Sequence, residues 1–156
     1  MSDASRTVSL ERLSKAVYRA TNANGDTLVV GESEGSFSAV ELLLTALAAC
    51  GAADVDYIVS KRDEPTSFRL RADANKVRDE GGNHLTDIVL TFDARFADTE
   101  AGEAARSVLP RAVQQSHDRL CTVSRTIQLG AGVDSVLAKL DQPPPPMSHG
   151  AGPTIG

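Results

Sequence analysis

The sequence predicts one domain that combines helices with antiparallel strands, and three features indicate this fold class. Residues 37–59 form a long apolar stretch of strong helix formers. Residues 67–73 and 85–96 alternate apolar and polar side chains at period two, which is typical of strands with one wet face. The pair Asn24 and Gly25 favours a tight hairpin near the N-terminus.

Length and C-terminal composition predict where the domain ends. With 156 residues, the chain is long enough for one domain with a sizeable core and too short for two comfortable ones. Beyond Leu140, a run of consecutive prolines and a glycine-rich end cannot bury enough surface to order themselves. We therefore predict a single domain over residues 1–140 and a flexible tail over residues 141–156.

The apolar stretch is predicted to be the central helix. Ser38 is placed as an N-cap, and Glu41 follows at the capping-box spacing. Within residues 39–49 only Glu41 and Thr45 are polar, so the helix has no ordinary wet face and must be buried. One chain of this length covers such a helix only barely, which points to a partner subunit. The apolar part is too short, and too soon followed by Asp54 and further charges, to span a bilayer, so we expect no membrane partner.

Shorter runs of strand-forming residues lie on both sides of this helix. Three of them predict an N-terminal antiparallel hairpin or a three-stranded meander, at residues 7–10, 15–18 and 27–30. Two more, separated by a turn signal at 79–83, predict a second antiparallel hairpin, at residues 67–73 and 84–96.

The C-terminal part is predicted to hold a second helix and a last strand. Acidic side chains in residues 98–103 favour a helix start, and the helix continues to about Ser116. Pro110 lies inside this helix, so we expect either a kink or a fresh helix that begins at Pro110. Residues 125–129 are predicted to form the last strand.

Charge excludes one class of partner, and the N-terminus indicates a location. Aspartate and glutamate outnumber lysine and arginine by 21 to 16, and the longest basic run is the pair Lys61 and Arg62. Both facts argue against a nucleic-acid partner. The first residues lack the apolar core of a secretory signal, so we expect a cytoplasmic protein.

The two cysteines, Cys50 and Cys121, have two interpretations. As a redox pair, a sulfenic acid on one would condense with the other thiol to form a disulfide. Cys50, on the central helix, is expected to be the less exposed and more strongly tuned thiol. Arg119 and Arg125 flank Cys121, and Arg19 lies in the predicted N-terminal sheet, so cations that lower a thiol pKa are plentiful. As core residues, both cysteines would simply be small buried side chains.

Other polar residues near the cysteines leave further alternatives. A zinc site can be drawn from Cys50, Cys121 and His117, but without a recognisable spacing motif, and we expect no metal and no cofactor. Asp54, one turn after Cys50, either raises the thiol pKa, holds an arginine over the sulfur, or makes a structural salt bridge or a hydrogen bond to a neighbouring backbone group. His117 is either a proton relay near Cys121 or a hydrogen-bonded structural residue.

The two cysteine motifs resemble one known family. Val40-Glu-Leu-Leu-Leu-Thr-Ala-Leu-Ala-Ala-Cys50, followed by Asp54-Val55, is similar to one signature of the OsmC/Ohr family, the osmotically inducible and organic hydroperoxide resistance proteins. Cys121-Thr-Val-Ser-Arg-Thr126 is similar to the other. The order of predicted elements also resembles that family, over about residues 10–133. This resemblance favours the redox pair over simple packing.

The resemblance implies a fold and a chemistry. The fold is α+β, in an intertwined homodimer whose antiparallel sheets enclose the central cysteine helices of both subunits. In the best-studied branch, the first cysteine attacks an organic hydroperoxide with help from an arginine and a glutamate. The second cysteine resolves the sulfenic acid, and a dithiol such as a lipoyl group reduces the disulfide. By position Cys50 is the peroxidatic cysteine, Cys121 the resolving cysteine, and Arg19 the candidate for the arginine.

The chain departs from that branch at the glutamate. The family's glutamate stands ten residues before the first cysteine and directly after a proline, where this chain has Val40 and Ala39. Glu41 stands one residue later and points away from Cys50 on a straight helix, so we expect it to act as a cap. The match is closer to the less characterised OsmC-like branches.

Three functional hypotheses follow. The first is a cytoplasmic thiol-dependent peroxidase that reduces organic hydroperoxides through Cys50 and Cys121. The second is an OsmC-like stress protein that binds a small apolar ligand, or senses oxidation, without efficient peroxidase turnover. The third is a structural dimer without chemistry, which predicts cysteines too far apart to bridge.

Overall fold

The computed structural model describes residues 4–139 and 141, which form two compact units. Among the described residues, one unit combines the chain up to Leu42 with the part from Val133 onward, and the other spans Leu43–Gly132. The predicted tail lies outside the described residues apart from Asp141. The single domain over residues 1–140 stays a prediction.

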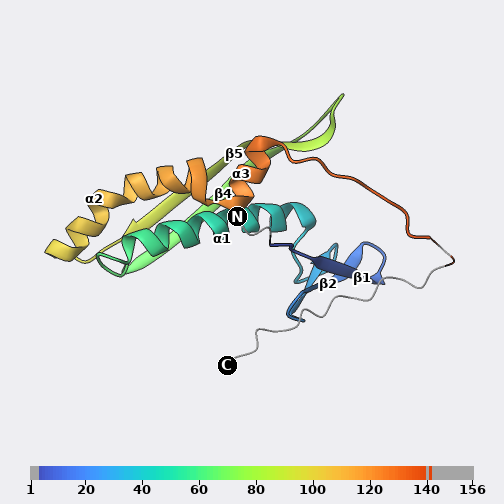
Figure 1. The fold of residues 1–156 in the computed structure, drawn as a ribbon, viewed down its shortest axis with the longest axis horizontal. Coiled ribbons are helices and arrows are strands. Elements are labelled where there is room, and N and C mark those ends of the chain that lie inside the picture. The colour runs from blue at the N-terminus through green and yellow to red at the C-terminus, as the bar shows by residue number, and fades with distance from the viewer. Residues whose placement is uncertain (1–3, 140, 142–156) are drawn as a thin grey trace. The chain divides into compact units, whose positions relative to one another are not determined.

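The first unit contains a three-stranded antiparallel meander, which confirms the prediction for the N-terminal part. The strands pair in chain order and are β1 (Val8–Ser14), β2 (Val17–Asn22) and β3 (Thr27–Gly31) (Figure 1). The turn between β2 and β3 is closed by Asn22, whose Oδ1 accepts hydrogen bonds from the amides of Asn24 and Asp26. Gly25 supplies the positive φ, 88°, that this turn requires.

Helix α1 (Ala39–Val59) starts with the predicted capping box. The Ser38 amide donates to Glu41 Oε2 at 2.8 Å, and the Glu41 amide donates to Ser38 Oγ at 3.2 Å. Glu41 is thus a capping residue, as its position in the first turn predicts.

Within the described chain, α1 is buried along one side only. Its buried residues are Leu47, Gly51, Val55 and Val59. By length and composition alone, α1 is able to cross a membrane, although core helices of soluble proteins meet the same description. The expectation that this stretch is too short for a bilayer is therefore wrong, because α1 has 21 residues. The absence of a membrane partner stays a prediction.

Strands β4 (Ser67–Asp79) and β5 (Gly82–Arg95) form the second predicted hairpin. They pair antiparallel from Ser67 opposite Arg95 down to Asp79 opposite Gly82. The alternating burial of β4 follows the period-two pattern of its sequence. Both strands are longer than predicted at the end near the turn.

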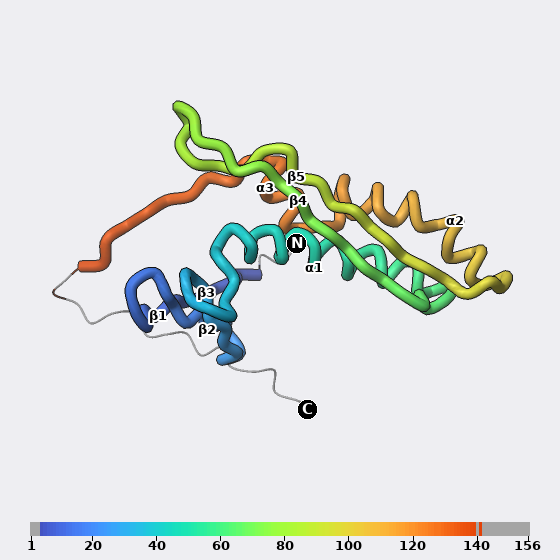
Figure 2. Tube along the Cα trace, turned by 180° about the vertical axis from the view of Figure 1, so that it is seen from behind, coloured from blue at the N-terminus to red at the C-terminus, as the bar shows by residue number. Residues whose placement is uncertain are grey.

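Helices α1 and α2 (Glu100–Gln115) cover one face of this hairpin, as the two opposite views show (Figures 1 and 2). The core between these layers is made of Val55, Val59, Phe96, Ala105 and Ala112. Helix α1 approaches β5 closely at Gly51, where an added Cβ would lie 3.3 Å from Cζ of Phe92 and make a tight contact.

Helix α2 runs through Pro110 without a break, so a fresh helix at Pro110 is not formed. The proline deprives the Arg106 carbonyl of its helical donor. Ala105 and Ala112, on either side of Pro110, are fully buried against the core, and this packing holds the helix continuous.

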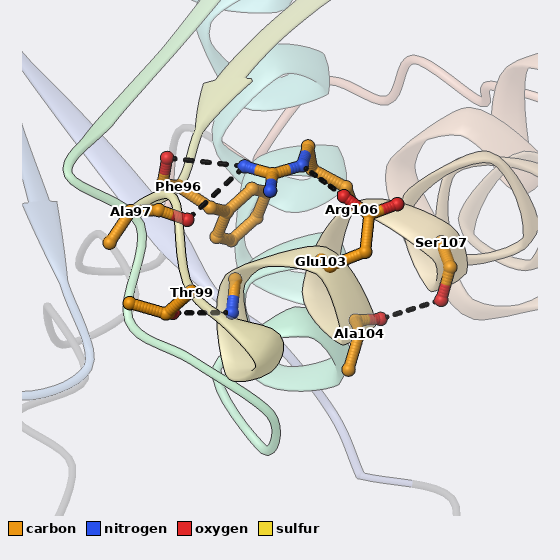
Figure 3. Close-up of polar contacts among 8 residues, drawn as sticks. Phe96, Ala97, Thr99, Glu103, Ala104, Arg106 and Ser107 are labelled. Carbon is orange, nitrogen blue, oxygen red and sulfur yellow. Dashed lines mark hydrogen bonds and ion pairs between the residues drawn. The ribbon is translucent and has the colours of Figure 1, made fainter.

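The start of α2 is held by several polar contacts (Figure 3). Thr99 Oγ1 accepts from the Gly102 amide at 3.0 Å, which caps the helix. Arg106 Nη1 donates to the carbonyls of Phe96 and Ala97, at 3.3 and 3.2 Å. A Cβ on Gly102 would lie 2.0 Å from the Ala97 oxygen, so this junction accepts only glycine.

The chain after α2 is helical, and the predicted strand over residues 125–129 is wrong. A π-helical turn, η1 (Ser116–Leu120), is followed by α3 (Thr122–Leu129). Gly130, at φ 65°, ends α3, and the amides of Gly130 and Ala131 bond back to the last turn. The β-branched residues of this segment favoured a strand, but caps at both ends stabilise a helix instead.

Candidate functional site

Cys50 and Asp54 lie one turn apart on α1, on the same side of the helix. Cys50 is partly exposed within the described chain, and so is Asp54. Leu47, one turn before Cys50, is buried, so this side of α1 faces the interior of its unit.

Cys121 occupies the junction between η1 and α3. Its amide donates to the Ser116 carbonyl at 3.0 Å, which closes the π-helical turn. Its sulfur accepts from the Ser124 amide at 3.4 Å, so the thiol itself is the N-cap of α3. The side chain is only 1% exposed. The expectation that Cys50 is the less exposed thiol is therefore wrong for this chain, because the turn and α3 enclose Cys121.

The fold brings both cysteines and Asp54 into one cluster. The two sulfurs and a carboxylate oxygen of Asp54 all lie within 4.8 Å of one another, and both thiols are free. Ser116, 2% exposed, donates its hydroxyl to Asp54 Oδ2 at 2.9 Å. Asp54 thus accepts a hydrogen bond from a side chain where a backbone partner was predicted, and its charge also raises the pKa of the Cys121 thiol. Within residues 4–139 and 141 Asp54 makes no salt bridge.

The setting of Cys121 keeps its thiol protonated at neutral pH. Burial above all, and then the hydrogen bond with Cys50, raise the pKa of Cys121 from 9.0 to about 11. The charge of Asp54 adds a smaller upward contribution, whereas the Ser124 amide favours the thiolate. Cys121 is therefore a buried neutral thiol rather than an activated one.

A mainly apolar cavity of about 230 Å³ borders Cys121. Its polar edge is formed by Ser116, His117, Ser124 and Gln128. The apolar part of its wall is formed by Leu47, Ile88, Leu90, Phe92, Val113 and Ile127. A small apolar molecule that enters this cavity would meet the Cys121 side of the cluster.

The remaining sequence-predicted site residues, Arg19 and His117, are not members of this cluster. Arg19 is on β2 in the first unit, where Nη1 lies 3.5 Å from Glu11 Oε2 in an exposed pair. Its catalytic role stays a prediction. His117 Nδ1 bonds to Asp118 Oδ1 at 2.8 Å, and its ring is largely exposed. The group that the fold assembles with metal-ligand spacing, among the described residues, contains Asp54 in place of His117.

Sequence reasoning missed two residues that bond to members of the cluster, Ser116 and Ser124. Ser124 stands three residues after Cys121, which is the spacing of an N-cap and its N3 partner, so a capping search that allowed cysteine would have found it. Ser116 has no comparable signal. Its hydroxyl bonds to Asp54 across 62 residues of sequence, from the point where α2 widens into the π-helical turn η1.

The fold and the cluster define an α+β protein that holds a pair of free thiols beside a carboxylate. The chain belongs to the family of OsmC-like proteins, which it matches over residues 31–135. No curated protein matches it.

Solved structures share this fold at low sequence identity. A hypothetical protein from Aquifex aeolicus VF5 superposes with a TM-score of 0.67 at 21% identity, covering 81% of this chain and 89% of that one. An OsmC-like protein from Mycoplasma pneumoniae gives 0.65 at 14% identity, over 81% and 89% of the chains. The organic hydroperoxide resistance protein OhrB of Bacillus subtilis gives 0.52 at 15% identity, over 78% and 90%. These likenesses confirm the α+β fold with antiparallel sheets.

Proposed function

We propose that this protein is a thiol-dependent peroxidase that reduces organic hydroperoxides through Cys50 and Cys121. The observation that carries the proposal is the pair of free thiols with sulfurs within 4.8 Å of each other. A disulfide needs the sulfurs at about 2.05 Å, a distance that side-chain rotation and a small backbone shift can reach. The chain belongs to the OsmC-like family, and a hydroperoxide resistance protein is among its structural neighbours. Both facts support a hydroperoxide as the substrate of this thiol pair.

The proposed reaction uses the thiols in sequence. The Cys50 thiolate attacks a peroxide oxygen, the O–O bond breaks, and the alkoxide takes a proton and leaves as the alcohol. The sulfenic acid on Cys50 then condenses with the Cys121 thiol. A sulfur–sulfur bond forms, and the hydroxyl leaves with the thiol proton as water. A dithiol reductant restores both thiols by exchange and is itself oxidised to a disulfide.

The exposure of the two thiols supports this order. Cys50 is partly exposed and accessible to a hydroperoxide, whereas Cys121 is enclosed by η1 and α3. A resolving cysteine needs to meet only the neighbouring sulfur, so burial does not hinder it. The apolar wall of the adjoining cavity favours hydroperoxides with an apolar body over hydrogen peroxide.

We further propose that the protein acts as a cytoplasmic homodimer, without nucleic-acid or membrane partners. Only one side of α1 is buried within the described chain, and Val40 and Leu43 on the same helix are each about 40% exposed. A second copy of the chain would cover this apolar surface. Arg19 remains the proposed activating arginine.

An alternative function is supported by the position of Glu41. This glutamate is occupied in the capping box with Ser38, so it does not take the place of the family's catalytic glutamate. A protein without that group would hold a small apolar ligand in the cavity, or sense oxidation, without efficient turnover.

Thiol counting tests the proposal. The reduced protein, kept with a metal chelator, receives one equivalent of cumene hydroperoxide or of hydrogen peroxide, and the products are digested with trypsin. We expect two thiols to be lost with cumene hydroperoxide, with residues 20–61 linked to residues 120–125 by Cys50 and Cys121. Hydrogen peroxide should react more slowly.

Two variants separate the roles. In Cys50→Ser, Cys121 should stay reduced, and in Cys121→Ser, Cys50 should accumulate as a sulfenic acid that dimedone traps. Survival of both thiols in the unmodified protein would sink the peroxidase proposal and leave the ligand-binding alternative.

A further inference from the structure

The cluster of Cys50, Asp54 and Cys121 has the ligand types and spacing of a site for a thiophilic divalent cation. Zinc binds thiolate sulfur at about 2.3 Å and carboxylate oxygen at about 2.0–2.2 Å, so neighbouring ligands around a tetrahedral ion lie roughly 3.5–3.8 Å apart. The three ligand atoms here all lie within 4.8 Å of one another. Side-chain rotations that move the ligand atoms by about an ångström are enough to bring all three within bonding distance of one ion.

Two hydrogen bonds already orient these ligands. Ser116 Oγ donates to Oδ2 of Asp54, which fixes the carboxylate and leaves its other oxygen for an ion. The Ser124 amide donates to the sulfur of Cys121. Outer contacts of this kind are what holds ligands in place at metal centres. The Ser116 hydroxyl is almost fully buried, so its contact with Asp54 is shielded from water.

The charge of the cluster also favours a cation. Asp54 has no salt-bridge partner among the described residues, and it stands beside two sulfurs whose ionised forms it repels. A divalent cation reverses this repulsion, because it stabilises the carboxylate and both thiolates together. Each thiol then releases one proton to solvent, and no electron is transferred. Partial exposure of Cys50 gives the ion a path of entry.

We propose that Cys50, Asp54 and Cys121 bind one zinc ion per chain, with a water in the fourth position. An ion that holds both sulfurs also keeps them from the disulfide, so zinc inhibits oxidation of the pair. This second statement rests on the proposed function, whereas binding itself does not. The site differs from the grouping with His117 that the sequence alone permits.

The experiment is a metal titration of the reduced, metal-free protein, with no hydroperoxide present. Cd²⁺ serves as the first probe because its thiolate bonds absorb in the ultraviolet, and Zn²⁺ then competes for the same site. We expect saturation at one equivalent per chain and release of two protons per ion in weakly buffered solution. Binding of Cd²⁺ without the ultraviolet absorption of thiolate bonds, or without the release of protons, would overturn the proposal.

Four variants define the ligands. Cys50→Ser should lose the thiolate-bound metal. Asp54→Asn, which keeps its shape and its hydrogen bond to Ser116, should weaken binding at least about 10-fold, and Ser116→Ala by roughly 10–100-fold. His117→Ala is the matched control and should bind like the unmodified chain. Unchanged affinity in Asp54→Asn, or loss of binding in His117→Ala, would contradict this ligand set.

Circular dichroism and thermal melts of the metal-free variants verify that each of them folds. Peroxidase activity is measured separately with a chelator present, so a failure of metal binding and a failure of the proposed function are distinguished.

Discussion

The two ends of α2 are fixed by different kinds of contact. At the N-terminal end, Thr99 caps the helix and Arg106 donates to two backbone carbonyls, so the contacts serve only to hold the chain (Figure 3). At the C-terminal end, the helix widens into η1, and the polar groups of Ser116 and Cys121 reach reactive side chains. One helix therefore has contacts that only hold the chain at its start and contacts with the cysteine cluster at its end.

The largest effect is expected at the N-terminal end, from Gly102→Ala. The new Cβ would lie 2.0 Å from the backbone oxygen of Ala97, which cannot move away without disrupting the junction. We expect the free energy of unfolding to fall by about 3 kcal/mol, despite the better helix propensity of alanine. Urea denaturation measures it. Gly132→Ala is the control, because its new Cβ would meet no atom within 4 Å beyond the adjoining residues of the chain. If Gly102→Ala and Gly132→Ala were equally stable, the N-terminal end of α2 would not be the tightly held end of the helix.

A smaller effect is expected at the C-terminal end, from Ser116→Ala. This change removes a buried hydroxyl that donates to the Asp54 carboxylate. We expect a loss of about 1.5 kcal/mol, since a hydrogen bond to a charged group is broken. Ser107→Ala is the control, because that hydroxyl is exposed and donates to the carbonyl of Ala104 in its own helix. If both variants unfold at the same urea concentration, the Asp54 contact contributes nothing to stability.

The third expected effect is a pH dependence of the free energy of unfolding that comes from the Cys121 thiol and emerges only in alkaline solution. Between about pH 9 and 11 the unfolded Cys121 thiol loses its proton while the buried thiol keeps it, so the free energy of unfolding falls as pH rises. Below pH 9 both states are protonated and the contribution is constant. Urea denaturation of the reduced, chelated protein should show this fall, and Cys121→Ser should show a shallower one. If the free energy of unfolding depended on pH in the same way in the unmodified protein and in Cys121→Ser, the pKa of the folded Cys121 thiol would not be raised.

The regular elements could be predicted from sequence because their signals are local. The capping box of Ser38 and Glu41 marks the start of α1, and period-two alternation marks the β4–β5 hairpin. The turn at Gly25 joins two strands of the meander. In each case the residues that carry the signal also make the contact, so no knowledge of distant residues is needed.

The irregular segment after α2 could not be predicted in the same way. Its β-branched residues favour a strand, and the deciding contacts are an unusual sulfur cap at Cys121 and the left-handed Gly130. The partnership of Ser116 with Asp54 depends on how η1 meets α1, which no local pattern encodes. The greater burial of Cys121 than of Cys50 has the same origin.

The sulfur cap of α3 has a consequence for how the protein can be observed. The Ser124 amide bonds directly to Cys121 Sγ, so any change of bonding at that sulfur alters the first turn of the helix. The nuclear magnetic resonance signal of this one amide is therefore a built-in reporter of whether the thiol is free, oxidised or bound to metal. It can be followed in intact protein, without a dye or a digestion step.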